Sequence, residues 1–453
     1  MRNKLLLLVS VLSLGIGYSQ EQTYSFTLEE AIQFALENNY SAINADRDLI
    51  DAQKQKWETI ADGLPQISGA LSYQNQLKQP VSVIPAEIFG GEPGTFAQVV
   101  FGQPQSATAT ATLKQQIFDG SYIVGVQATK AFLSYSNNNK EKTALEVRKQ
   151  VVEAYGNVLL AEESVEILEK NKNTLEKNVY ETSKLYENGL GEQENVDQLQ
   201  ITLSSIENQL QNALRLKEIT LQMLNLSMGL DLSAPTQLQE NLEDLTVSKI
   251  DIGLLNYDFN INENVDFKLA ENLNQQRYYE WKLAKSRALP TLNAFVNYGS
   301  SAYSNTFDFF SSDQQWFDSS ILGFDLSIPI FSSLKRNAST QRAKIALEKA
   351  KTQLTEAEQQ IRLQLDNAKN NYTLAIANYE TAKQNLTLSE RIENKNQIKY
   401  KEGLATSFEL RQAQTQLYTT QQEFLQSMVE VINKKTELES LFNKIKLKHS
   451  LNH

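Results

Sequence analysis

Cysteine and histidine, which often serve as nucleophiles, proton carriers and metal ligands, are few in this sequence. Carboxylates are abundant, with 54 Asp and Glu, but on helices they mostly solvate the surface. The 453 residues include no cysteine and only two histidines, His449 and His453, both at the very end of the chain. Because metal centres need several such ligands close together, we expect no metal site, and no other cofactor. A glycine-rich loop that could hold a phosphate is also absent from the sequence. The net charge of −11 argues against nucleic acid as a partner. We therefore expect a protein that is not an enzyme.

The N-terminal segment predicts export from the cytoplasm. Arg2 and Lys4 precede an apolar run over 5–16, and small residues follow. This pattern is typical of a secretory signal peptide, which we expect to span 1–19. The run is shorter than the roughly 20 apolar residues that a membrane-spanning helix needs, and no later segment reaches that length. Insertion into a membrane would therefore have to use β-strands.

Long helices are predicted by two stretches without proline, 105–234 and 330–453. Within both stretches apolar residues recur every three or four positions, which is the heptad pattern of coiled coils. Helices are expected over 120–188, 195–229, 333–402 and 406–446. The two longest would each measure about 100 Å at 1.5 Å per residue, which is too long for a compact globule.

The expected long helices end at matching turns. Tyr186 and Gly189-Leu190 in the first half correspond to Tyr400 and Gly403-Leu404 in the second. Glycine suits the left-handed residue that follows a helix. Thr406 and Glu409 have the spacing of a capping box, which would start the next helix. Each turn therefore predicts the tip of a helical hairpin.

These turns are part of an internal duplication. Two further pairs of motifs recur in the same order at a similar spacing, and this indicates two repeats. The pairs are Leu64-Pro65 with Leu289-Pro290, and Ile117-Phe118 with Ile330-Phe331. We expect a first repeat over 20–230, a linker over 231–259, a second repeat over 260–446 and a tail over 447–453.

Between these motifs the period changes to two, which predicts strands. Apolar and polar residues alternate over about 66–77, 105–117, 291–300 and 320–330. Such strands fit a transmembrane β-barrel, and they fit equally well a half-buried antiparallel sheet in water. In a membrane, four strands could not close a barrel around a lumen, so several copies would have to share one. Three copies would give twelve strands, although the sequence does not fix that number.

Over nearly its whole mature length the chain resembles the TolC family of outer-membrane efflux proteins. The resemblance rests on the order and duplication of short motifs: Thr27-Leu28-Glu29-Glu30-Ala31 with Asn38-Asn39, the two Leu-Pro strand entries, the two hairpin tips, and Gln412-Ala413-Gln414. The loop over 84–96 resembles in particular members from Bacteroidetes. The resemblance implies an internally duplicated α+β membrane protein. Long coiled-coil helices would form a periplasmic tunnel, and four strands per chain would form a shared, twelve-stranded trimeric β-barrel in the outer membrane.

The resemblance also implies partners and a function. The homotrimer would dock onto a periplasmic adaptor (a membrane fusion protein) and an inner-membrane efflux pump or ABC transporter, which supplies the energy. The chain would be a passive exit duct for efflux or type I secretion, lying in outer-membrane lipid and extending into the periplasm. The sequence does not name the cargo.

Candidate site residues follow from the same resemblance. Family members use the hairpin tips to constrict the tunnel and to contact the adaptor, and this points to Tyr186, Gly189, Leu190, Tyr400, Gly403 and Leu404. Where well-studied members carry acidic gate residues, this chain has Asn195, Glu409 and Gln412. An arginine of their ionic lock is replaced by Ala405. We therefore expect Glu409 to form a threefold ring of carboxylates that favours cations.

Two questions stay open at the level of sequence. The loops over 78–104 and 301–319 are rich in aromatic residues, which suits the membrane interface, a constriction at the outer mouth or a self-packed loop. The main rival to the channel is a periplasmic or surface coiled-coil scaffold without a pore. A scaffold would be soluble without detergent.

Overall fold

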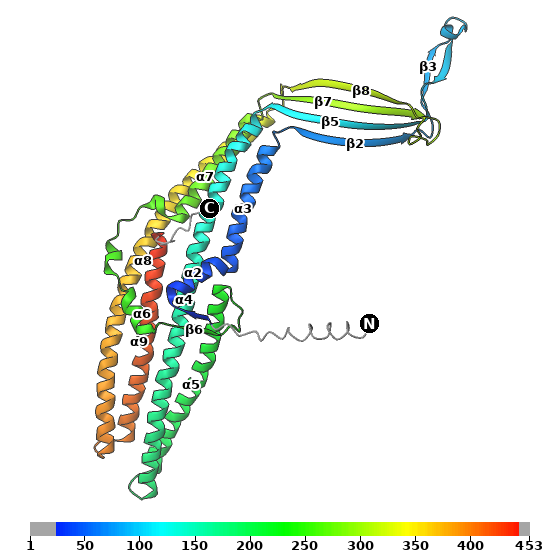
Figure 1. Cartoon of the computed structure of the whole chain (residues 1–453). Helices are drawn as coiled ribbons and strands as arrows, with labels where there is room; N and C mark the ends of the chain where they lie inside the picture. Colours follow the sequence, from blue (N-terminus) through cyan, green and yellow to red (C-terminus); the bar gives the residue numbers. More distant parts are fainter. Residues whose placement is uncertain (1–23, 444–453) are drawn as a thin grey trace, which may run out of the picture. The chain divides into compact units, whose positions relative to one another are not determined.

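The computed structural model describes residues 24–443, so the expected signal peptide and tail lie outside the described residues. The chain forms two compact units. The helical unit comprises 24–49, 135–271 and 353–443, and the sheet unit comprises 50–134 and 272–352. Figure 1 shows the elements of both. Within the described residues, none of the helices is both long enough and apolar enough to cross a membrane.

The sheet unit is built around four antiparallel strands. They are β2 (Gln66–Asn75), β5 (Gln105–Asp119), β7 (Thr291–Ser304) and β8 (Trp316–Ser327). Their order is β2-β5-β7-β8, so each repeat contributes one neighbouring pair and β2 and β8 form the edges. A bulge interrupts the pairing of β5 with β7 between Gln116 and Phe118. The strands overlap the segments in which residues alternate. β7 starts at the expected residue and extends four residues further, and β8 begins and ends a few residues earlier than expected.

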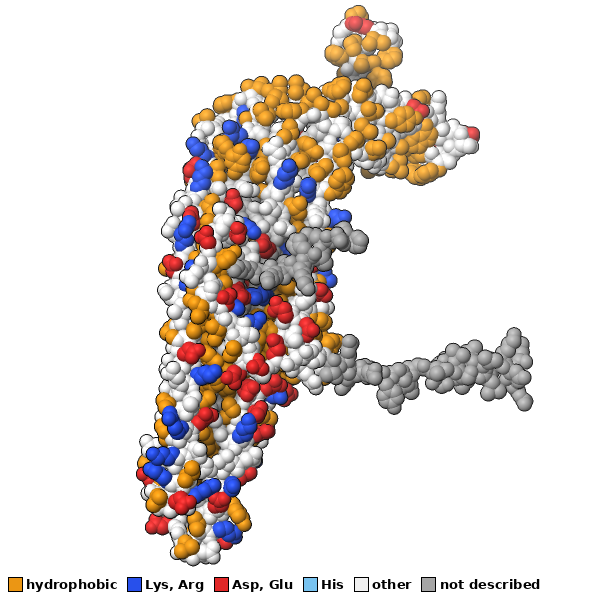
Figure 2. Space-filling view, turned by 60° about the vertical axis from the view of Figure 1, so that its left-hand side comes forward, with side chains coloured by type: hydrophobic (Ala, Val, Ile, Leu, Met, Phe, Trp, Pro, Cys, Tyr) orange, Lys and Arg blue, Asp and Glu red, His pale blue; other side chains and the backbone are white. Residues whose placement is uncertain are grey.

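The two faces of this sheet differ in chemistry. The cross-strand register places Ile67, Leu113, Val296 and Leu322 in one row, and alternation brings Leu71 to the same face. On this apolar face the large aliphatic and aromatic side chains are 61–76% exposed at Ile67, Leu71, Leu322, Phe324 and Leu326. The opposite face is mostly polar, with many serine, threonine and asparagine residues, and it also carries Phe295 and Ile321. On this face Thr108 Oγ1 lies 3.1 Å from Ser301 Oγ. Figure 2 shows hydrophobic side chains gathered over the strands, whereas most charged side chains lie over the helices.

The loop between β2 and β5 contains a second, small hairpin. β3 (Val81–Pro85) pairs with β4 (Phe96–Val100), and a short 3-10 helix, η1 (Ala86–Phe89), lies between them. Exposed apolar side chains at Val83, Phe89 and Phe96 line this hairpin. Apart from the aromatic content of the loop, no sequence pattern predicts that β3 and β4 pair.

Four long helices dominate the fold. They are α4 (Gly120–Glu187), α5 (Gln193–Met228), α8 (Lys335–Lys401) and α9 (Ser407–Leu441). Their buried residues are those at heptad spacing, for example Val147, Val151 and Val158 in α4. Leu168 and Leu175 of α4 pack against Leu203, Ile206 and Leu210 of α5 in a separate cluster. Shorter helices precede each pair of strands: α2 (Leu28–Asn38) and α3 (Tyr40–Ala61) in the first repeat, and α7 (Val265–Ser286) in the second.

The segment expected to be a linker, 231–259, is packed rather than free. It contains β6 (Thr236–Leu238), α6 (Leu242–Lys249) and η2 (Ile252–Asn256), and a further turn, η3 (Ile261–Glu263), follows it. β6 pairs in parallel with β1 (Tyr24–Phe26). Leu242 and Leu245 are buried in the largest core cluster. The Glu240 carboxylate accepts hydrogen bonds from Leu28 N, at 2.6 Å, and from Tyr155 Oη, at 3.2 Å. The segment still joins the repeats, but its apolar side chains bury it against the helices.

Candidate functional site

The tips of the two helical hairpins have the same backbone geometry. Gly189 and Gly403 both have φ of 70°, the left-handed conformation that a residue with a Cβ adopts only at a cost. Gly189 N donates to Tyr186 O, and Leu190 N donates to Leu185 O, both at 2.9 Å. This pair of bonds is a Schellman motif, which satisfies the last carbonyl groups of α4. The motif fixes where the helix stops and the chain turns.

The second tip repeats the motif. Gly403 N donates to Tyr400 O at 3.0 Å, and Leu404 N donates to Lys399 O at 2.7 Å. Leu190 and Leu404 are 76% and 78% exposed. In a Schellman motif this position usually makes an apolar contact back to the helix. The two leucines instead present uncovered apolar surface at the tips.

The helices that leave the tips start differently. α9 starts with a complete capping box, because Glu409 N donates to Thr406 Oγ1 while the Glu409 carboxylate accepts from Thr406 N at 2.8 Å. These hydrogen bonds from Thr406 hold the pKa of the exposed Glu409 below its usual value. At the start of α5 the N-cap residue is Glu192, whose side chain makes no cap hydrogen bond. The capping box expected from the sequence is therefore confirmed in the second repeat.

Polar contacts join the two hairpins near their tips. Thr182 Oγ1 of α4 lies 2.8 Å from Tyr400 Oη of α8, and either hydroxyl can be the donor. Ser407 Oγ of α9 donates to Asn195 Oδ1 of α5. Further from the tips, Asn171 Nδ2 of α4 donates to Gln421 Oε1 of α9 at 2.9 Å. Two sequence-predicted residues, Tyr400 and Asn195, thus belong to contacts between hairpins.

The remaining candidate gate residues lie outside these contacts. Glu409 and Gln412 are exposed on α9. Sequence reasoning missed Thr182, Ser407, Asn171 and Gln421. A signal for them existed, because Ser407, Gln414 and Gln421 recur every seven residues where a coiled coil normally has apolar residues.

The row of polar residues on α9 that contains Ser407, Gln414 and Gln421, here called the polar seam, also faces α8 within the second hairpin. Gln414 is fully buried, and its amide faces Glu393 of α8 without a hydrogen bond of ordinary geometry. Burial raises the pKa of Glu393, and the neighbouring amide opposes that shift only in part. Burial also raises the pKa of Tyr418, with the negative charge of Glu393 adding to the effect. Because buried polar groups without full hydrogen bonding cost free energy, this part of the helix packing stabilises the fold less than the apolar packing around Leu425 and Val429 further along α9.

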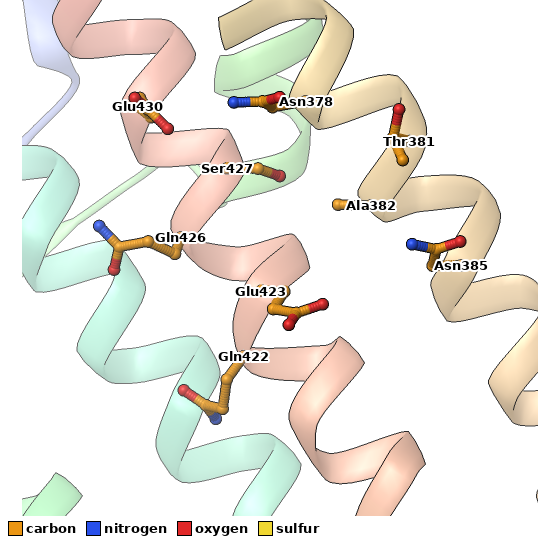
Figure 3. Close-up of a pocket in the computed structure, with 9 residues that line it drawn as sticks. All are labelled: Asn378, Thr381, Ala382, Asn385, Gln422, Glu423, Gln426, Ser427 and Glu430. Carbon is orange, nitrogen blue, oxygen red and sulfur yellow. The ribbon is translucent and has the colours of Figure 1, made fainter.

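A groove of about 530 Å³ lies between α8 and α9. Figure 3 shows amide side chains lining it from both helices and carboxylate side chains lining it from α9. Glu423 and Glu430 are its acidic members and stand seven residues apart on α9. Across residues 24–443 the structure contains no group of three or more histidine and acidic side chains placed to hold a metal ion. The groove is therefore a polar surface between two helices.

Comparison with known proteins gives a consistent family and fold. The family model described as outer membrane efflux protein matches residues 31–230 and 260–444. No curated protein sequence matches the chain.

Solved structures with the same fold include three bacterial outer membrane proteins. VceC of Vibrio cholerae aligns with a TM-score of 0.70 at 17% identity, over 92% of this chain and 96% of that chain. CmeC of Campylobacter jejuni gives 0.72 at 17% identity, over 92% and 85% of the two chains. The open state of MtrE of Neisseria gonorrhoeae gives 0.71 at 17% identity, over 92% and 88%. Identities this low establish a shared fold and nothing finer.

Proposed function

Because this chain belongs to the outer membrane efflux protein family, we propose that it is the passive exit duct of a tripartite efflux or type I secretion system. Channels of this family lie in the outer membrane and extend into the periplasm, which gives the location of this chain. The duct is a homotrimer that a periplasmic adaptor and an inner-membrane pump or ABC transporter open by docking. The pump supplies the energy, and the chain carries out no reaction.

The observation that carries this proposal is an open sheet with one apolar face. Among residues 24–443, β2 and β8 each have a partner strand on only one side, so each leaves a row of backbone N–H and C=O groups unpaired within this part of the chain. An unpaired edge cannot persist in lipid. Pairing β2 of one copy with β8 of the next satisfies both edges, and three copies close a barrel of twelve strands. The apolar face then meets lipid and the serine- and threonine-rich face lines the lumen.

The same observation weighs against a soluble scaffold. A half-buried sheet in water covers its apolar face with other elements. Here side chains such as Ile67, Leu71 and Leu322 remain largely exposed on the chain. A patch of this kind marks an interface with lipid or protein.

The hairpin tips are the proposed gate and docking site. The residues that contact the adaptor are Tyr186, Gly189 and Leu190 at one tip and Tyr400, Gly403 and Leu404 at the other. The contacts between hairpins hold the tips together until docking separates them. Glu409 forms a threefold ring of carboxylates that favours cations, with Asn195 and Gln412 beside it.

The proposal is tested by single-channel recording of the purified protein in planar bilayers, with Glu409→Gln and Glu409→Ala. We expect small, cation-selective openings whose selectivity falls in both variants. Glu30→Gln is the matched control, because Glu30 closes the same kind of capping box with Thr27 at the start of α2. A wild-type protein that is soluble without detergent and never inserts would overturn the channel and favour the scaffold. If the Glu409 variants show normal conductance and unchanged selectivity, the channel proposal stands but the proposed carboxylate ring at Glu409 is contradicted.

A further inference from the structure

The loop between β7 and β8, residues 305–315, packs its aromatic side chains onto the end of the sheet. Phe309 is only 5% exposed and lies in a small core cluster with Ala107 and Ala302, against which Trp316 also packs. Tyr73 on the edge strand β2 lies edge-to-face with Phe307, with ring centroids 5.2 Å apart, and with Phe309, at 5.8 Å. The loop is thus held by four strands at once.

The register shows which face of the sheet the loop covers. Tyr73 is opposite Ala107, Ala107 is opposite Ala302, and Ala302 is opposite Trp316, so the four residues form one cross-strand row. Counting by twos along β2 and β8 leads from this row to Leu71 and to Leu322, both on the apolar face. Phe309 therefore lies on the apolar side, and the alanines provide the room for its ring.

The outer part of this aromatic cluster is uncovered. Phe310 is 87% exposed and Phe307 is 61% exposed, although each ring contacts the other at a centroid distance of 6.2 Å. Next to them the loop carries only polar residues, Ser311, Ser312 and Asp313. Exposed aromatic rings beside a polar segment, at the end of an apolar band, are typical of the boundary between hydrocarbon and lipid headgroups.

We propose that the loop over 305–315 is a membrane-interface anchor that lies against lipid on the outside of the barrel, and that it does not constrict the outer mouth. This inference rests on the proposed function, because it requires the apolar face to meet lipid. Phe307 and Phe310 enter the interface, Phe309 fixes the loop to the strands, and the polar residues reach the headgroups. Any narrowing of the outer mouth by a loop then falls to the β3–β4 hairpin.

The test places a fluorescent reporter on the loop. The chain has three tryptophans, and Trp57→Phe, Trp281→Phe and Trp316→Phe together give a background in which Phe310→Trp is the only tryptophan. This protein is reconstituted into phosphatidylcholine vesicles whose acyl chains are brominated near the headgroup. We expect bromolipid to remove much of the emission at position 310 and aqueous iodide to remove little. A protein that keeps only Trp281, on helix α7, is the matched control and should respond in the opposite way.

A loop over the mouth gives a different result. Emission at position 310 would then be quenched by iodide and not by bromolipid, and this overturns the inference. Conductance gives an independent readout, because Phe307→Ala with Phe310→Ala should leave it unchanged if the loop lies in lipid and should raise it if the loop narrows the mouth. If the protein never inserts into a bilayer, the proposed channel function itself is contradicted. If conductance is normal but iodide quenches the emission at position 310, the channel proposal stands and only the anchor proposal is contradicted.

Discussion

Replacing Tyr400 by phenylalanine removes the hydroxyl that joins α8 to α4 near the tips while leaving the ring in place. Its partner, Thr182, is only 3% exposed, so water does not readily replace the lost hydrogen bond. Such a bond contributes about 1 kcal/mol to the joined state. If the tips of three chains separate together, the loss is about 3 kcal/mol, which shifts the closed-to-open ratio about a hundredfold toward open.

The assay is the open probability of single channels in planar bilayers, without adaptor. Tyr400→Phe and Thr182→Val should each raise the open probability. The free-energy change in the double variant should be much smaller than the sum of the two single changes, because both substitutions remove the same hydrogen bond. Tyr180→Phe is the control, since Tyr180 lies on α4 close to Thr182 but is 63% exposed. An open probability equal to wild type in Tyr400→Phe, or fully additive effects in the double variant, would refute the idea that this contact holds the tips together.

Three further predictions concern stability and insertion. Gly229→Ala should lower the free energy of unfolding by clearly more than Gly189→Ala, measured by chemical unfolding in detergent. Both glycines have positive φ, which costs a Cβ-bearing residue about 1–2 kcal/mol, but only at Gly229 would the new Cβ also meet backbone, 2.1 Å from a carbonyl oxygen of α2. Burial raises the pKa of Glu393, so the folded chain binds this proton more tightly than the unfolded chain does. Stability should therefore fall as pH rises from the ordinary carboxyl range through the raised pKa, and Glu393→Gln should flatten that part of a thermal-unfolding profile. Leu322→Arg on the apolar face should cost about 2–4 kcal/mol near the bilayer midplane and reduce insertion into vesicles, whereas Thr110→Arg on the polar face should insert normally; equal insertion of the two would contradict the assignment of the faces.

Local patterns explain why much of the fold was predictable. Heptad spacing and the absence of proline define α4 and α8, and strict alternation defines β5, because both signals depend on neighbours a few residues apart. The hairpin tips were equally readable, since the Schellman motif at Gly403 and the capping box of Thr406 with Glu409 use only residues within the turn.

Contacts between residues far apart in the chain could not be predicted from local sequence patterns. β1 and β6 pair across more than two hundred residues, and each has only three residues with no alternation to reveal it. Their pairing converts the expected linker into part of the core. The contact of Thr182 with Tyr400 depends on how two separate hairpins pack together. The sequence around either residue therefore does not predict it. In the aromatic loop, composition allowed three interpretations. The position of Phe309 over Ala107 and Ala302, on which the proposed anchor rests, depends on contacts between segments far apart in the chain.

The sequence by itself therefore predicted the four long helices and the four long strands, the apolar face of each, the turns at the two hairpin tips, and two repeats. These properties follow from interactions within a few residues of the chain. The tertiary structure alone decided which surfaces meet: the order β2-β5-β7-β8 with two open edges, the polar seam between the hairpins, and the side of the sheet on which the loop over 305–315 lies. The physical reason is that periodicity reports how much apolar surface must be covered, whereas the group that covers it is chosen by packing between residues far apart in the chain.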